Sequence, residues 1–98
     1  MSAVELVLDR LQEWYRSQCD GDWEHSYGVK IETLDNPGWL VTIDLADTDW
    51  EHLSQPRTIV QRSDTDWIQC EVAERKFIGC GGVSNLGELM ELFLGIVK

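Results

Sequence analysis

Residues 29–45 of the chain read VKIETLDNPGWLVTIDL, and this stretch decides the fold. Apolar and polar side chains alternate over 29–33 and again over 39–45, which is the period of a β-strand with one buried face. The tetrapeptide DNPG at 35–38 is a strong turn signal, because proline fixes φ and glycine accepts a positive φ. The sequence therefore predicts a β-hairpin over residues 27–46.

Outward from this hairpin, both ends of the chain carry the three-and-four spacing of an amphipathic helix. The apolar positions of the first helix, over residues 3–17, are Val4, Val7, Leu8, Leu11, Trp14 and Tyr15. Those of the second are Leu86, Leu89, Met90, Phe93, Ile96 and Val97. Ser2 with Glu5, and Asn85 with Glu88, fit the capping box that begins a helix.

Three further strands are predicted between the hairpin and the second helix. They cover residues 58–62, 67–73 and 76–80, with a turn at 63–66 and an irregular connection over 46–57. The economical architecture is α+β: an antiparallel sheet of about five strands, with the N-terminal and C-terminal helices packed on one face. A chain of 98 residues can bury one core, so we expect a single domain over residues 1–98.

Composition and charge exclude several classes of function. Eighteen acidic residues against eight basic ones give a net charge of −10, and a field of that sign repels phosphate backbones and anionic lipid. We therefore expect no direct nucleic-acid or membrane partner, and either solubility alone or attraction to a basic partner. No apolar run approaches the ~20 residues of a membrane helix, and the chain start lacks an export signal. Cytoplasmic localisation and three reduced thiols, Cys19, Cys70 and Cys80, follow as expectations.

Half of the acidic residues fall between Asp20 and Glu51, a stretch whose only Lys or Arg is Lys30. Tryptophan among carboxylates is typical of a surface that binds a basic protein. Trp39 is in phase with the buried face of its strand, but Trp23 and Trp50 allow two interpretations, exposed anchors or core packing. Because the basic residues of the second half lie elsewhere in the sequence, the negative field is expected to be one-sided. The predicted partner-binding residues are Asp20, Asp22, Trp23, Glu24, His25, Asp47, Asp49, Trp50 and Glu51.

Two chemical alternatives deserve a test, although the sequence predicts neither a cofactor nor a catalytic residue. The loop from Cys19 to His25 alternates carboxylates with a glycine, but it lacks the length of a calcium loop and the paired cysteines of a zinc site. Cys80 precedes two glycines and a helix start, where a helix dipole can lower a thiol pKa. A small thiol enzyme or sulfurtransferase is therefore the alternative function, whereas a small buried cysteine at the end of a strand is the structural interpretation.

The sequence also resembles a known family. The segments LQEWY (11–15), QCDGDWEHSYG (18–28) and KIETLDNPGW (30–39) are similar to the immunity protein 53 family, and a looser similarity continues through Asp66-Trp67 and the C-terminal helix. The resemblance implies a small cytoplasmic protein of a bacterial polymorphic toxin system, which binds and neutralises a cognate toxin domain. Many such toxins are nucleases, whose basic clefts an acidic surface could occupy or block. Relatives have sometimes been labelled rhodanese-related sulfurtransferases, a label that only Cys80 supports here.

Overall fold

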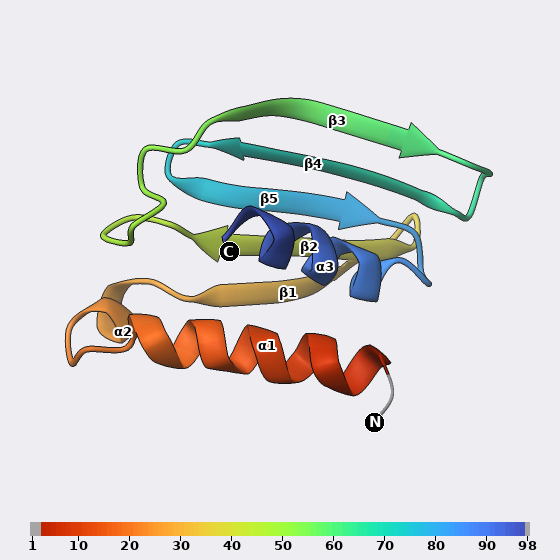
Figure 1. Cartoon of the computed structure of the whole chain (residues 1–98). Coiled ribbons are helices and arrows are strands. Elements are labelled where there is room, and N and C mark those ends of the chain that lie inside the picture. The colour runs from red at the N-terminus through yellow and green to blue at the C-terminus, as the bar shows by residue number, and fades with distance from the viewer. Residues whose placement is uncertain (1–2, 98) are drawn as a thin grey trace.

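The computed structural model describes residues 3–97, and its elements follow the predicted order (Figure 1). The helices are α1 (Ala3–Gln18), a short α2 (Trp23–Ser26) and α3 (Leu86–Ile96). The strands are β1 (Val29–Leu34), β2 (Gly38–Asp44), β3 (Gln55–Gln61), β4 (Trp67–Ala73) and β5 (Lys76–Gly81). The prediction of an α+β protein with five strands between two amphipathic helices is confirmed.

All neighbouring strands of the sheet are antiparallel, in the order β1-β2-β5-β4-β3. The predicted hairpin pairs Val29 with Ile43 and Leu34 with Gly38, so the DNPG tetrapeptide is the turn. The last strand of the sequence, β5, lies at the centre between β2 and β4. The turn from β4 to β5 holds Glu74 and Arg75 at φ 53° and 63°, the left-handed region that two-residue hairpin turns of type I′ require.

α1 and α3 cover one face of the sheet, as predicted, and the core lies between them and the sheet (Figure 1). Its side chains with almost no exposed surface are Val41, Ile43, Leu45, Val72, Phe77, Leu89 and Phe93. α3 crosses β5 closely at Gly79, where a Cβ would lie 3.2 Å from Cδ2 of Leu89. The opposite face of the sheet carries Leu40 and Cys80 side by side, and no helix within residues 3–97 covers it.

The structure departs from the prediction most clearly in two segments, the one before the expected third strand and the loop after α1. β3 begins at Gln55, inside the segment expected to be irregular, and it includes Pro56. An edge strand tolerates proline because one side of its backbone has no ladder to maintain, and every residue of β3 is exposed. The loop after α1 contains the four-residue helix α2, which the sequence did not predict.

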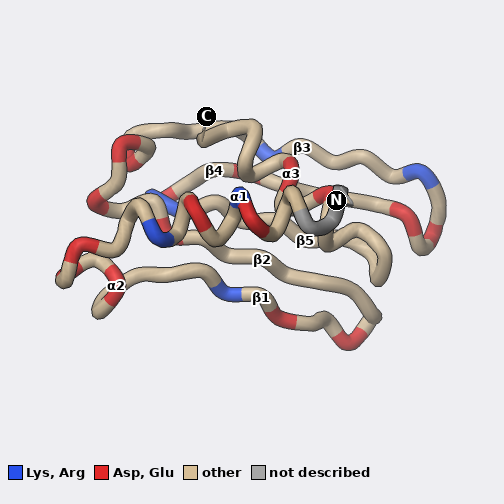
Figure 2. Tube along the Cα trace, turned by 60° about the horizontal axis from the view of Figure 1, so that its bottom comes forward, with Lys and Arg blue, Asp and Glu red and all other residues tan. Residues whose placement is uncertain are grey.

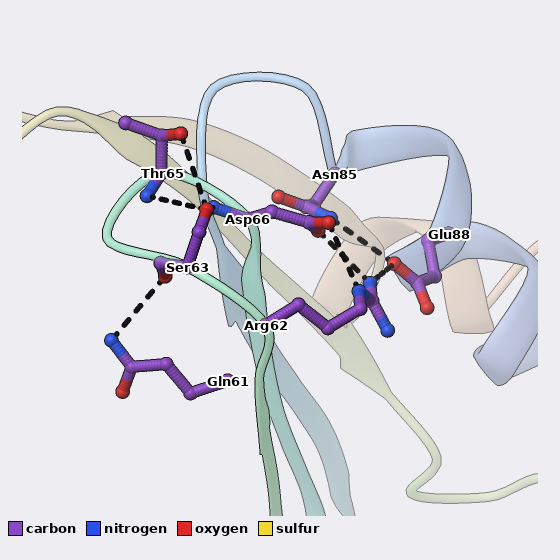
Figure 3. Close-up of polar contacts among 7 residues, drawn as sticks. All are labelled: Gln61, Arg62, Ser63, Thr65, Asp66, Asn85 and Glu88. Atoms are coloured by element: carbon purple, nitrogen blue, oxygen red, sulfur yellow. Dashed lines mark hydrogen bonds and ion pairs between the residues drawn. The ribbon is translucent and has the colours of Figure 1, made fainter.

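The predicted capping box at the start of α3 is wrong, and a polar network replaces it (Figure 3). The Asn85 side chain does not cap α3. Its Nδ2 instead donates to Asp66 Oδ1 at 2.9 Å and to Glu88 Oε1 at 3.1 Å. Arg62 pairs with the same two carboxylates, so the network ties the β3–β4 turn to the first turn of α3. Ser2 of the predicted Ser2–Glu5 box lies outside the described residues.

None of the helices within residues 3–97 combines the length and the apolar character needed to cross a membrane.

Candidate functional site

The two acidic segments that the sequence singled out meet at one end of the sheet. α2 and the loop that follows β2 lie side by side at this end (Figure 1), and Trp23 Nε1 donates a hydrogen bond to the Ala46 carbonyl oxygen at 2.9 Å. Trp14 of α1 lies between them, with its ring centroid 6.1 Å from that of Trp23 and 6.0 Å from that of Trp50. Three indoles therefore join segments that are more than 20 residues apart in the sequence.

Trp23 belongs to the core, which corrects the interpretation of this residue as an exposed anchor. Its side chain is only 4% exposed and packs against Trp14, Tyr15 and Tyr27. Burial of a large indole with its N–H satisfied is a structural arrangement, so Trp23 supports the surface without forming it. Trp50 and Trp39 are both half-buried and pack against the same core, as expected for Trp39.

Two carboxylates of the first segment hold its loop in shape. Asp20 Oδ1 accepts hydrogen bonds of 3.0 Å from the backbone N–H groups of Asp22 and Trp23. These bonds, with that of Trp23 first, lower the pKa of Asp20. Glu24 reaches back to accept from the backbone N–H groups of Asp20 and Gly21, at 3.0 Å for each nearest oxygen. Hydrogen bonds from backbone N–H groups to carboxylates of the same segment thus hold the conformation of residues 19–26.

Glu51 plays the same part in the second segment. Its Oε1 accepts from the Asp47 backbone N–H at 3.3 Å and lies 3.4 Å from Nη1 of Arg75. The Asp47 hydrogen bond, ahead of Arg75, lowers the pKa of Glu51. Asp47 itself has a φ of 59°, a left-handed conformation that Asp adopts more readily than most residues.

Three carboxylates of this end remain available to a partner. Asp22, Asp47 and Asp49 are exposed, and over residues 3–97 their carboxylates make no hydrogen bond or ion pair. His25 is also exposed. We call the six carboxylate residues Asp20, Asp22, Glu24, Asp47, Asp49 and Glu51 the acidic end.

The negative field is not one-sided, contrary to expectation. Acidic positions lie at both ends of the sheet, with basic ones among them (Figure 2). The β4–β5 turn brings Arg75 to the acidic end, where it pairs with Glu51. Arg57 and Arg62 also pair with carboxylates, at 3.6 Å from Glu71 and 2.5 Å from Glu88. Because antiparallel strands run back along one another, residues from the second half of the sequence can lie beside residues from the first half.

Cys80 does not have the environment of a reactive thiolate. Its side chain lies on the open face of the sheet, whereas α3 covers the face to which Gly79 belongs. The thiol therefore points away from the helix start that was expected to activate it. Burial is the main cause that raises the pKa of Cys80, and the nearby Arg57 offsets it only partly. A raised pKa disfavours the thiolate at neutral pH.

No group of three or more His, Cys, Asp or Glu side chains in the described part of the chain is arranged to hold a metal ion. In the loop that suggested one, Asp20 and Glu24 accept backbone N–H groups, and Cys19 Sγ donates to the Tyr15 carbonyl oxygen at 3.3 Å.

Comparison with known proteins gives the class to which this chain belongs. A family model described as Immunity protein 53 matches residues 8–98, which makes the protein an immunity protein. The chain belongs to the Immunity protein 53 family, as its sequence resemblance implied, and this membership suggests a toxin-neutralising role. The searches of curated proteins and of solved structures gave no match.

Proposed function

We propose that this protein neutralises a basic toxin domain by binding it through the acidic end. The observation that carries the proposal is the meeting of two acidic segments at one end of the sheet, joined by the Trp23–Ala46 hydrogen bond. Half of these carboxylates hold the loops, and Asp22, Asp47 and Asp49 present their charge to solvent. Rigid loops that carry unpaired charge favour fast, electrostatically steered association.

Trp50 supplies the aromatic part of this surface. Its half-buried ring packs on Trp14, which fixes its orientation, and its remaining surface is open to a partner. A partly exposed, immobilised indole loses little side-chain entropy on binding. The toxin that fits this surface has a basic cleft, as a nuclease does for its phosphate substrate, and the immunity protein occupies or blocks that cleft.

The test measures binding to the cognate toxin domain, used in a catalytically inactive form. The variant Asp22→Asn/Asp49→Asn removes two charges from the acidic end. The control Asp35→Asn/Asp64→Asn removes two exposed charges at the opposite end of the sheet. We expect the first pair to slow association and flatten the salt dependence of the affinity, while the control keeps both close to wild type.

Growth of cells that express the active toxin gives the functional measurement. Wild type and the control pair should protect these cells, and the Asp22/Asp49 pair should protect them less. Equal association rates and equal salt dependences for the two double variants would show that the acidic end is not part of the interface. Failure of the wild-type protein to bind the toxin domain would overturn the proposed function itself.

A further inference from the structure

α1 and the edge strand β1 leave an apolar groove between them on the helix side of the sheet. Its volume is about 340 Å³, and its lining residues are Leu11, Gln12, Tyr15, Gly28 and Val29. We call this space the α1–β1 groove. Figure 1 shows the two elements running along each other at the margin of the fold.

Large apolar side chains stay exposed around this groove. Leu8 is 42% exposed and Tyr15 40%, and they share one stripe of α1 because residues seven apart lie on the same helix face. Ile31 is 42% exposed and follows Val29 on the same side of β1. Exposed apolar side chains that gather at one hollow, rather than lying singly, mark an interaction surface.

Acidic residues border the groove. Tyr15 also lines a second hollow on α1, together with Asp9, Glu13 and Arg16, and Arg16 forms an ion pair with Glu13. Glu24 of α2 also lies close to the Tyr15 phenol. Cys19 and burial raise the pKa of Tyr15, and the negative charge of Glu24 adds a smaller effect in the same direction. Because Arg16 pairs with Glu13, Asp9 and Glu24 are the carboxylates that favour a cationic group beside an apolar one in the groove.

The groove is continuous with the acidic end. The Tyr15 ring packs at 63° against the Trp23 ring, with centroids 6.0 Å apart, and Trp23 is the residue that joins the two acidic segments. A single partner can therefore reach both surfaces. Interfaces concentrate their affinity in a desolvated aromatic or apolar centre, surrounded by polar contacts that exclude water.

We propose that the α1–β1 groove receives an apolar side chain of the toxin, flanked by lysine or arginine residues that face the acidic border. This inference rests on the proposed function and assigns to the groove the apolar anchor that the sequence had placed at Trp23. The acidic end then governs the rate of association, and the groove governs the rate of dissociation.

The experiment compares groove variants with matched variants elsewhere, against the same inactive toxin domain. Leu8→Gln/Ile31→Thr removes two exposed apolar side chains and keeps a helix former and a β-branched residue in place. The control Leu6→Gln/Ile59→Thr makes the same changes at side chains that are 50% and 57% exposed, on another face of α1 and on the opposite edge strand. Tyr15→Ala is the second groove variant, and urea unfolding establishes that each variant is folded.

We expect both groove variants to weaken toxin binding about tenfold or more through faster dissociation, with an unchanged salt dependence. The control should stay within about twofold of wild type. Groove variants that are folded and dissociate at the wild-type rate would overturn the inference while the proposed function stands. If the wild-type protein itself fails to bind, the proposed function fails and the inference fails with it.

Discussion

Replacement of Trp23 by alanine should destabilise the whole fold, because this residue anchors both acidic segments. The substitution empties a site that is 4% exposed, and truncation of a buried tryptophan costs about 3–5 kcal/mol. It also removes the edge-to-face contact with Trp14 and leaves the carbonyl of Ala46, itself 6% exposed, without its donor. A domain of this size has a total stability of about 5–15 kcal/mol, so the loss is a large fraction of it.

Urea unfolding followed by circular dichroism measures this loss. Trp23→Phe keeps most of the ring volume and deletes the hydrogen bond to Ala46, so it should cost about 1–3 kcal/mol and fall between wild type and Trp23→Ala. Trp50→Ala is the matched control, because Trp50 contacts the same Trp14 ring but is only half-buried. Its cost should be clearly smaller than that of Trp23→Ala.

A Trp23→Ala variant whose unfolding free energy lies within about 1 kcal/mol of wild type would refute this reasoning. The indole would then contribute little to the core, and the original interpretation of Trp23 as a partner-binding residue would become the better one.

Three more predictions concern other parts of the molecule. Gly82→Ala should destabilise the fold by about 2 kcal/mol or more, because its Cβ would lie 2.2 Å from the Thr65 carbonyl oxygen. Gly95→Ala should stabilise α3 by about 0.5 kcal/mol, because a Cβ there meets nothing within 4 Å. Thermal unfolding of the two variants measures both effects. Arg62, and then Asn85, lower the pKa of Asp66 below its ordinary value of 3.8, so its contribution to stability is present above that pH and is lost as the pH falls below it. The stability difference between wild type and Asp66→Asn should therefore be constant near neutral pH and shrink in acid; a difference that does not change with pH would contradict the role of this ion pair. Cys80 should react slowly with a thiol reagent at neutral pH and faster as the pH rises above 9, measured in a Cys19→Ser/Cys70→Ser background that leaves it the single cysteine, and Cys80→Ser should still protect cells from the toxin. Rapid labelling at neutral pH would restore the thiol-enzyme alternative.

The elements of this fold could be predicted from the sequence where hydrophobic periodicity and turn chemistry agree. The alternation over 39–45 and the DNPG turn determine the β1–β2 register, since a slip of one residue would expose Val41 and Ile43. The start of β3 at Gln55 could not be predicted, because proline in a strand depends on whether that strand lies at an edge. The β4–β5 turn carries no Asn-Gly or Asp-Gly signal, as Glu74 and Arg75 occupy its two positive-φ positions.

The candidate site was harder to predict than the fold. The sequence identified both acidic segments, and their meeting at one end depends on the position of α2 beside the loop after β2. Trp23 stands alone among polar residues, so no periodicity indicates which way its side chain points. The α1–β1 groove was missed because Leu8, Tyr15 and Ile31 fit the apolar positions of a helix and a strand, and only the packing shows that α1 leaves them partly uncovered.

The place of β5 in the sheet has a consequence for how the chain is made. β5 is the last strand to be synthesised and pairs with both β2 and β4, so the β1–β2 hairpin and the β3–β4 hairpin stay separate until residues 76–81 have formed. An isolated hairpin is marginally stable in water. We therefore expect the nascent protein to acquire its tertiary structure late, when β5 closes the sheet and α3 covers it. A ribosome-bound chain that ends before residue 76 should lack the folded acidic end, because the core that orients Trp14 and Trp23 does not yet exist.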